Sequence, residues 1–313
     1  MQLDPVIRGF LESLAAQPGP KMWELAAPDA RAVFAALMQL VGPQDVPIGK
    51  VFDMKAQGPR GDIPLRNYTP KGRDDALLPT LVFYHGGGFV IGDLETHDGL
   101  CRMFANQAGV RVIAVDYRLA PEHKFPAAVE DACAAIDWIC ANAPELGVDA
   151  TRVAVGGDSA GGNLSAVVAQ AAKTKGGPKL AFQMLLFPVT QIGSDTKSMR
   201  ERGEGFFLEK AALDWWFGQY LDKGADRSDI RMSPLLARDL SGLPPAYLML
   251  AGFDPLYDEG SAYAGKLRDA SVAVTVADYP DLVHDFIYLQ AVLPQAGEAL
   301  RAASAALHGA LFA

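Results

Sequence analysis

Cysteine is scarce in this sequence, and its spacing excludes two classes of protein. Only three cysteines occur in 313 residues, at Cys101, Cys133 and Cys140. None forms a C-x-x-C pair or lies near histidines at metal-ligand spacing, so the pattern indicates neither a disulfide framework nor a zinc site. We therefore expect reduced thiols, a cytoplasmic protein, and a site without a metal ion or cofactor.

Basic residues and long apolar runs are also scarce. The chain has 28 Lys and Arg against 37 Asp and Glu, a net charge of −9, which argues against nucleic acids and anionic membranes as partners. No window approaches the ~18 uninterrupted apolar residues of a membrane span. Residues 1–20 lack the basic and apolar regions of a signal peptide. We expect no nucleic-acid partner and no membrane segment.

Apolar residues make up 50% of the chain, enough for one large core. Short apolar runs typical of buried strands alternate with helical spacing, which predicts an α/β fold with a mostly parallel, eight-stranded sheet flanked by helices. The expected strands are 46–54 and 63–68, joined by a turn at 58–62, then 81–84, 110–115, 152–156, 181–187, 246–251 and 272–277. The expected helices are 4–16, 28–41, 100–108, 127–141, 163–173 and 295–311.

Two segments interrupt this alternation. Residues 1–45 precede it, and residues 190–240 are rich in aromatic side chains but contain no strand pattern. An insertion between core strands at this point lies over the carboxyl ends of the sheet, where ligands bind in open α/β folds. We expect both segments to form a helical cap on a single domain, anchored by Trp215 or Trp216.

One pentapeptide has the form of a nucleophile elbow. Gly157-Asp158-Ser159-Ala160-Gly161 lies between an expected strand and an expected helix, the setting in which G-x-S-x-G exposes a serine hydroxyl at a strained turn. The glycines are needed because a Cβ there would collide with neighbouring backbone. The pattern predicts Ser159 as a nucleophile; the alternative is a small-residue turn that packs a helix on a sheet.

A serine nucleophile needs an adjacent base, and the chain has five histidines. Hydrolases of this architecture order the three residues as Ser, then Asp or Glu, then His. Only His284 and His308 lie late enough, and His308 falls in an Ala-rich terminal helix where an exposed position is expected. His284 follows a strand-like run and an expected loop at 280–283, so we predict it as the base.

Four carboxylates compete to orient His284. Asp254 directly follows the expected strand 246–251, where it could also cap the next helix, and we predict it as the orienting residue. Asp258 and Glu259 lie a turn later in that helix. Asp285 adjoins His284, but adjacent side chains usually diverge.

Acyl transfer also needs donors for the oxyanion. His85-Gly86-Gly87-Gly88 follows a strand and fits the H-G-G-G loop that supplies backbone N–H groups. No G-x-G-x-x-G or P-loop lysine accompanies it, which disfavours a phosphate cradle. We predict the N–H groups of Gly87, Gly88 and Ala160 as the donors and His85 as a structural residue.

Together these motifs resemble the bacterial hormone-sensitive lipase family of carboxylesterases, in its G-D-S-A-G subgroup. The resemblance also includes Asp116-Tyr117-Arg118-Leu119-Ala120-Pro121-Glu122, Phe125–Ala128 and Asp254–Glu259. It implies an α/β-hydrolase core with a cap, metal-free hydrolysis of esters with short acyl chains, and homodimers formed through sheet edges. We read the 116–122 block as scaffold with Asp116, Arg118 and Glu122 in buried polar contacts. One departure is Asp285, where many relatives have glycine.

The sequence thus predicts a serine carboxylesterase for short- to medium-chain esters, acting through Ser159, His284 and Asp254 and an acyl-enzyme. The same residues would serve an amidase, lactonase or deacetylase. A small-molecule receptor on this fold is the rival from another class, and the presence of His284 argues against it. Residues expected in the substrate pocket are Phe89, Asp158, Phe206, Phe207, Leu208 and Val283.

Overall fold

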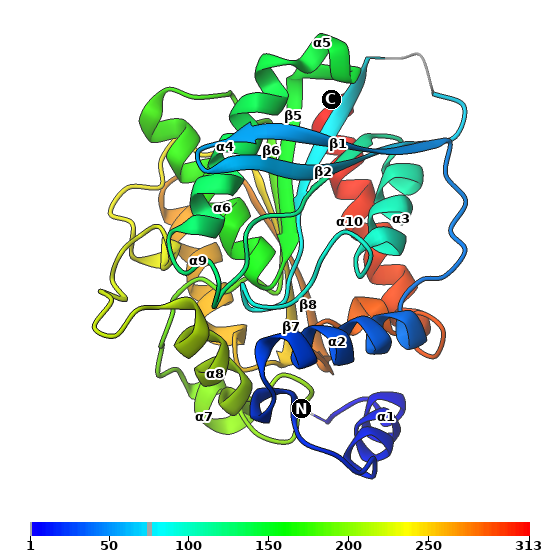
Figure 1. The fold of residues 1–313 in the computed structure, drawn as a ribbon, viewed down its shortest axis with the longest axis vertical. Helices are drawn as coiled ribbons and strands as arrows, with labels where there is room; N and C mark the ends of the chain where they lie inside the picture. The colour runs from blue at the N-terminus through cyan, green and yellow to red at the C-terminus, as the bar shows by residue number, and fades with distance from the viewer. Residues whose placement is uncertain (1, 74–76) are drawn as a thin grey trace.

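The computed structural model describes residues 2–73 and 77–313, and one twisted β-sheet forms its centre (Figure 1). Within these residues the sheet has eight strands in the order β1-β2-β4-β3-β5-β6-β7-β8. The β1–β2 and β2–β4 pairs are antiparallel and the others parallel, which confirms the expected mostly parallel sheet. The strands are β1 (Lys50–Gly58), β2 (Gly61–Thr69), β3 (Leu78–Tyr84), β4 (Arg111–Val115), β5 (Val148–Asp158), β6 (Phe182–Leu186), β7 (Ala246–Phe253) and β8 (Val274–Val283).

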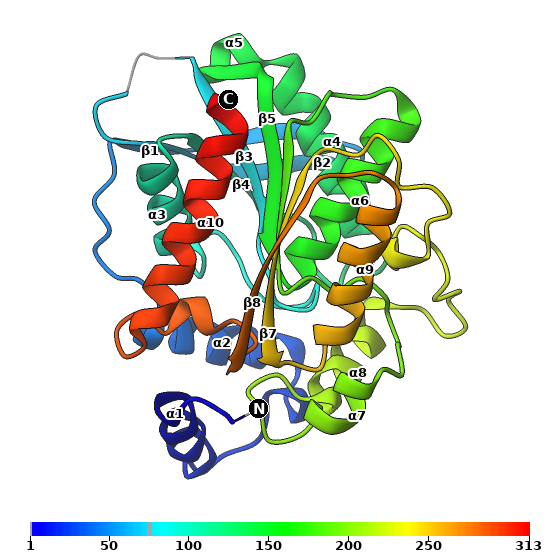
Figure 2. The same cartoon turned by 180° about the vertical axis from the view of Figure 1, so that it is seen from behind.

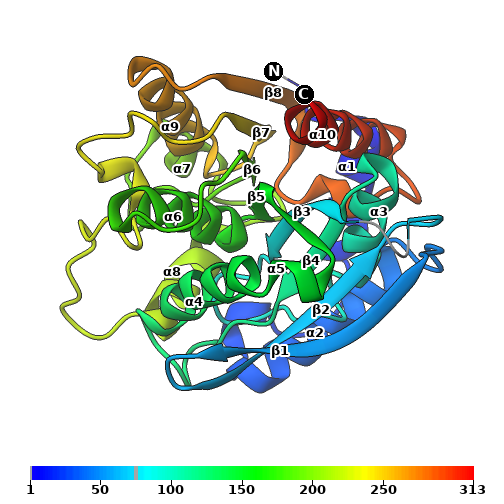
Figure 3. The same cartoon turned by 90° about the horizontal axis from the view of Figure 1, so that it is seen from above.

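Helices cover both faces of the sheet. Seen from above, α4, α6 and α9 lie on one face, and α3 and α10 lie on the other (Figure 3). None of the described helices is long and apolar enough to cross a lipid bilayer. The helices are α1 (Pro5–Ala15), α2 (Ala27–Val41), α3 (Asp98–Ala108), α4 (Ala127–Ala141), α5 (Ala143–Leu146), α6 (Ala160–Lys175), α7 (Lys197–Arg202), α8 (Lys210–Tyr220), α9 (Tyr257–Asp269) and α10 (Pro294–Phe312).

The central strands form the core because helices exclude water from both of their faces. Every residue of β3, β4 and β6 is buried, which explains why these strands are mostly apolar in the sequence. Full burial of one Val, Leu or Ile side chain contributes roughly 1.5–3 kcal/mol. The core therefore provides a rigid frame for the residues that follow each strand.

One of the two expected strand connections is wrong. The turn expected at 58–62 joins β1 to β2, but it is shorter, covering residues 59 and 60, because Gly58 and Gly61 already pair as strand residues. Residues 280–283 belong to β8 and are not a loop. Pro280 is compatible with β8 because this is an edge strand, whose open side needs no N–H donor. In β8, polar residues and a proline on a solvent-facing strand resemble a loop signal.

Helices α1, α2, α7 and α8 gather at the end of the molecule to which β7 and β8 point (Figures 1 and 2). Residues 222–240 instead lie beside α6 and α9. There the carbonyl of Met232 accepts a hydrogen bond from the Asn163 side chain at 2.9 Å. Thus helices from two segments that are distant in sequence gather at the same end of the sheet.

Two charged side chains of the 116–122 block differ in their surroundings. Arg118 donates two hydrogen bonds to the buried carboxylate of Asp131, each of 2.8 Å, as the scaffold reading predicts. Glu122 was expected to be buried, but its side chain is 48% exposed and pairs with Arg31 of α2 at 2.6 Å. Arg31 also donates to the carbonyl of Val90 at 2.8 Å. The block therefore holds α2 against the core.

Candidate active site

Ser159 occupies the sharp turn between β5 and α6, with φ +52° and ψ −114°. A non-glycine residue in this region is strained and persists only where its surroundings hold it. Here its N–H donates to the carbonyl of Leu186 at 2.8 Å. Gly157 and Gly161 have no room for a side chain, because a Cβ on either would overlap the carbonyl oxygen of Tyr84. The geometry expected of the pentapeptide is present.

His284 and Asp254 meet at the carboxyl ends of β8 and β7. The Nδ1 of His284 lies 2.6 Å from Oδ2 of Asp254, and the other carboxylate oxygen accepts the Leu256 N–H at 2.8 Å. Ser159 and His284 are only 4% and 3% exposed, so the site is covered. Within the described part of the chain, no hydrogen bond joins the Ser159 hydroxyl to His284.

The two competing carboxylates of α9 have other partners. Asp258 accepts the Ser198 N–H at 2.8 Å. Glu259 accepts the N–H groups of Thr190 and Gln191 at 2.7 and 3.2 Å, and also the Ser194 hydroxyl. Both therefore bind the segment that follows β6. Among the carboxylates considered from the sequence, Asp254 is the one that contacts Nδ1 of His284.

The electrostatic surroundings of His284 favour its protonated form. Burial alone would lower the pKa of the imidazole, but the carboxylates of Asp254 and Asp285 and the hydrogen bond to Asp254 raise it to about 9. An opposite charge within hydrogen-bond distance stabilises the charged form of a titrating group. The imidazole therefore keeps its proton to higher pH than a free histidine and is a stronger base once it is neutral.

The glycine loop after β3 presents backbone N–H groups without acceptors. Gly87 and Gly88 have φ values of +111° and +60°, in the region that favours glycine. The Gly87 carbonyl accepts from Val90 and Ile91, each at 3.0 Å. Across the described residues, the N–H groups of Gly87, Gly88 and Ala160 have no protein acceptor. Such free donors can stabilise a negative oxygen.

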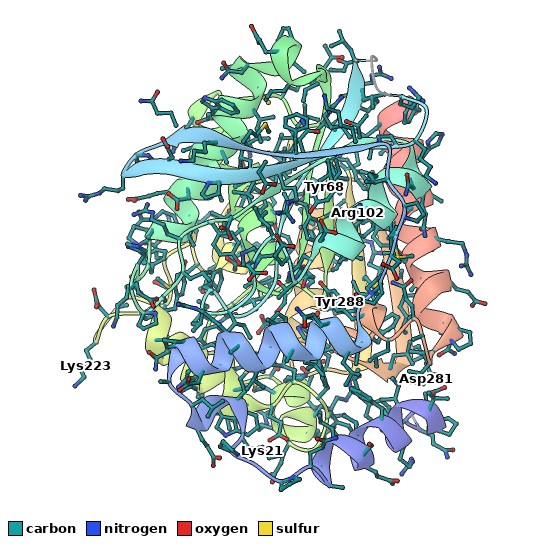
Figure 4. The ribbon with its side chains drawn as sticks, turned by 45° about the vertical axis from the view of Figure 1, so that its right-hand side comes forward. Lys21, Tyr68, Arg102, Lys223, Asp281 and Tyr288 are labelled. Atoms are coloured by element: carbon teal, nitrogen blue, oxygen red, sulfur yellow. The ribbon has the colours of Figure 1, made fainter. Side chains whose placement is uncertain are left out.

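A buried polar network around Asp158, which was not predicted from the sequence, holds the glycine loop in place. Asp158 accepts the Gly86 N–H at 3.1 Å and lies 3.4 Å from His97 Nε2. The Tyr288 hydroxyl, in the interior near α2 (Figure 4), donates to the same carboxylate at 3.3 Å. These contacts favour a loop-holding role for Asp158 over its predicted pocket role. The only sequence signal for His97 was its position at the start of α3.

His85 has the structural environment that was expected. Its ring stacks on Tyr117 at a centroid distance of 4.3 Å, and the Tyr117 hydroxyl donates to the His85 carbonyl at 2.7 Å. Burial and the neighbouring His97 lower the pKa of His85 to about 4, so it is neutral near pH 7. The exposed position expected for His308 is also confirmed.

The aromatic residues predicted for the pocket pack against other aromatic rings. Phe89 is fully buried and stacks on Tyr220 at 4.1 Å. Phe206 packs on Phe253 of the core at 5.0 Å, and Phe207 packs on Phe10 of α1 at 6.0 Å. Leu208 and Val283 are buried.

Of the two candidate anchor tryptophans, Trp216 lies against the glycine loop. A Cβ placed on Gly88 would meet the Trp216 ring. Because Gly88 carries one of the free N–H groups, this ring lies beside the predicted oxyanion site.

Comparison with known proteins agrees with this fold. A family model described as alpha/beta hydrolase fold matches residues 81–288, and the chain belongs to this family. The resemblance to hormone-sensitive lipases is confirmed at this level, while the G-D-S-A-G subgroup stays a prediction.

Three similar proteins illustrate the relationship. Carboxylic ester hydrolase LipN of Mycobacterium tuberculosis is 52% identical over 245 residues, covering 76% of this chain but 65% of LipN, less than two thirds of its length. Carboxylesterase NlhH of the same species is 40% identical over 99% of this chain and 97% of its own. The crystal structure of a mutant of LAE6, an alpha/beta hydrolase from the metagenome of Lake Arreo, Spain, matches with a TM-score of 0.96 and 42% identity over 98% of each chain.

Proposed function

We propose that this protein is a serine carboxylesterase. The observation that carries the proposal is the 2.6 Å contact between His284 Nδ1 and Asp254 Oδ2, at the sheet edge where Ser159 occupies its strained turn. An imidazole oriented by a carboxylate is the base that a serine nucleophile requires. The similarity to proteins named as carboxylic ester hydrolases supports the same activity.

In this mechanism the Ser159 hydroxyl attacks the ester carbonyl while His284 Nε2 accepts its proton. Asp254 keeps the imidazole in the correct tautomer and stabilises its charged form. The N–H groups of Gly87, Gly88 and Ala160 stabilise the tetrahedral oxyanion. His284 then protonates the leaving alkoxide, which leaves an acyl-enzyme on the serine. A water molecule, activated by the same base, attacks the acyl-enzyme and releases the acid.

Replacement of the nucleophile tests the activity. With p-nitrophenyl butyrate, Ser159→Ala should lower kcat/KM at least about a thousandfold, because the remaining site supplies only binding and oxyanion stabilisation. Ser241→Ala, at an exposed serine, should leave kcat/KM unchanged. Retention of more than about a thousandth of the activity by Ser159→Ala would contradict the proposal.

We also propose that residues 1–45 and the first part of 190–240 form a cap that limits substrate size to short- and medium-chain esters. The ring contacts of Phe10 with Phe207 and of Phe206 with Phe253 support it, because they close the cap over the strand ends. A series of p-nitrophenyl esters from acetate to laurate tests this limit. Highest kcat/KM on laurate would contradict it.

The predicted homodimer and cytoplasmic location are further proposals. The edge strands β1 and β8 support a dimer, because an edge strand presents unpaired backbone groups that can pair with another chain. Light scattering of the purified protein would measure its mass in solution.

A further inference from the structure

Asp285 brings a second carboxylate to the imidazole of His284. Its Oδ2 lies 3.6 Å from Nε2, the nitrogen opposite the one that contacts Asp254. Its Oδ1 is buried and has no hydrogen-bond partner among the described residues. The side chain as a whole is 17% exposed. Water therefore screens this charge only in part, and His284 is its nearest cation.

The backbone explains how adjacent side chains come together. β8 ends at Val283, and Asp285 adopts φ +56° and ψ +18°, a left-handed conformation that non-glycine residues seldom take. The chain thus turns directly after His284. The expectation that the side chains of His284 and Asp285 diverge is wrong for this reason, although Asp254 remains the residue at Nδ1.

The charges around the imidazole come from several elements. Asp254 faces it from the end of β7, Asp285 from its own segment, and Asp158 from the end of β5. His97, which precedes α3, lowers the pKa of Asp285 when its ring is protonated. Burial raises the pKa of Asp285 to about 6, although the charge of the nearby His284 lowers it in part. Above that pH the carboxylate is charged, and it stabilises the protonated imidazole through Nε2.

We propose that Asp285 is a positioning residue that holds the protonated form of His284 through Nε2 and so competes with Ser159 for that nitrogen. The role rests on the proposed function, because Nε2 is the atom that takes the serine proton there. While the imidazolium donates toward Asp285, it cannot act as a base. Once it is neutral, the Asp285 charge makes it a stronger base and stabilises the imidazolium that forms as the serine attacks.

Removal of the Asp285 charge should therefore have two opposite effects. In Asp285→Asn the midpoint of the acidic limb of kcat/KM should move down by about one pH unit, because a nearby charge no longer favours the imidazolium. The value of kcat/KM on the alkaline plateau should fall about threefold, because a general base whose pKa is lower by about one unit accepts the serine proton less readily. The variant should thus be more active than the wild type at low pH and less active at high pH. A residue that only supports the fold would lower both arms together.

The experiment compares pH profiles of full-length Asp285→Asn and Asp285→Gly with the wild type, using a neutral p-nitrophenyl ester. Glycine tolerates the left-handed backbone, so this variant tests the proposal if the asparagine variant folds poorly. The matched control is Asp281→Asn, which removes the same charge four residues earlier on β8 (Figure 4). Its profile should match that of the wild type.

A titration that needs no activity separates this proposal from the proposed function. Nuclear magnetic resonance of isotope-labelled histidine, with His284→Ala to assign the signal, reports the pKa of His284 directly. A downward shift of about one unit in both Asp285 variants, absent in Asp281→Asn, supports the proposal even if no ester is hydrolysed. An unshifted His284 signal, or an unshifted acidic limb in an active variant, would overturn it.

Discussion

The core side and the cap side of this site are built from different interactions. On the core side each group follows a strand and has short polar contacts, such as the 2.6 Å contact between His284 and Asp254 and the 3.1 Å bond from Gly86 to Asp158. On the cap side, packed rings predominate, as in the 6.0 Å pair of Phe10 and Phe207. The polar groups of the candidate site are therefore placed by strand ends, and the proposed cap is held by helix and ring packing.

The difference has an energetic basis. Buried polar groups are costly unless they are hydrogen-bonded, so the core contacts tolerate little displacement. An aromatic pair contributes about 0.5–1.5 kcal/mol beyond its buried area and allows a range of ring orientations. Changes on the core side should accordingly affect kcat, whereas changes on the cap side should affect which ester is accepted.

The largest effect is expected on the core side, from Asp254→Asn. The amide keeps the shape of the carboxylate but cannot hold the His284 tautomer or its charge, so kcat on a short ester should fall about 10³- to 10⁴-fold. Asp258→Asn is the matched control, because Asp258 contacts Ser198 and not the imidazole. A loss below about tenfold in Asp254→Asn would mean that another group orients His284, with Asp285 the nearest candidate.

A smaller effect is expected on the cap side, from Trp216→Ala. The Trp216 ring lies against Gly88, so its removal opens space beside the predicted oxyanion site. The kcat/KM ratio of a laurate ester to an acetate ester should rise about tenfold, within the range that a pocket gives for a few methylenes. Trp215→Ala, at the neighbouring half-buried tryptophan, should leave the ratio unchanged. A uniform loss on all esters would instead place Trp216 in the chemistry.

The smallest effect is expected where core and cap meet, at Glu259. Burial outweighs the hydrogen bonds from Ser194, Thr190 and Gln191 and raises the pKa of Glu259 to about 7. An unfolded glutamate ionises near pH ~4.3. The folded state thus holds the proton more tightly, and stability falls as pH rises from ~4.3 through about 7.

Glu259→Gln tests this sign. Its Tm should decline less than that of the wild type between about pH 5 and pH 8, because glutamine has no proton to lose. Glu204→Gln, at an exposed position in the cap segment, is the control. Equal declines for the wild type and Glu259→Gln would show that Glu259 stays ionised in the fold.

Much of the core side could be predicted from the sequence. The order of Ser159, Asp254 and His284, with the glycine loop upstream, has a local signature because each residue lies shortly after a strand-like run. The missed features have no such signature. His97 and Tyr288 meet Asp158 across remote parts of the chain. Strand β8 was placed too short because an edge strand carries polar residues and Pro280.

By itself the sequence determined the alternation of strands and helices, the glycines that the sharp turns require, and the residues able to do acyl-transfer chemistry. These follow from local patterns, because backbone sterics and burial act over a few residues. Only the tertiary structure decided that Asp254 faces Nδ1 and Asp285 faces Nε2, and that Trp216 lies over Gly88. Side-chain direction depends on how each strand ends and on which remote segment packs against it, and neither is encoded in spacing alone.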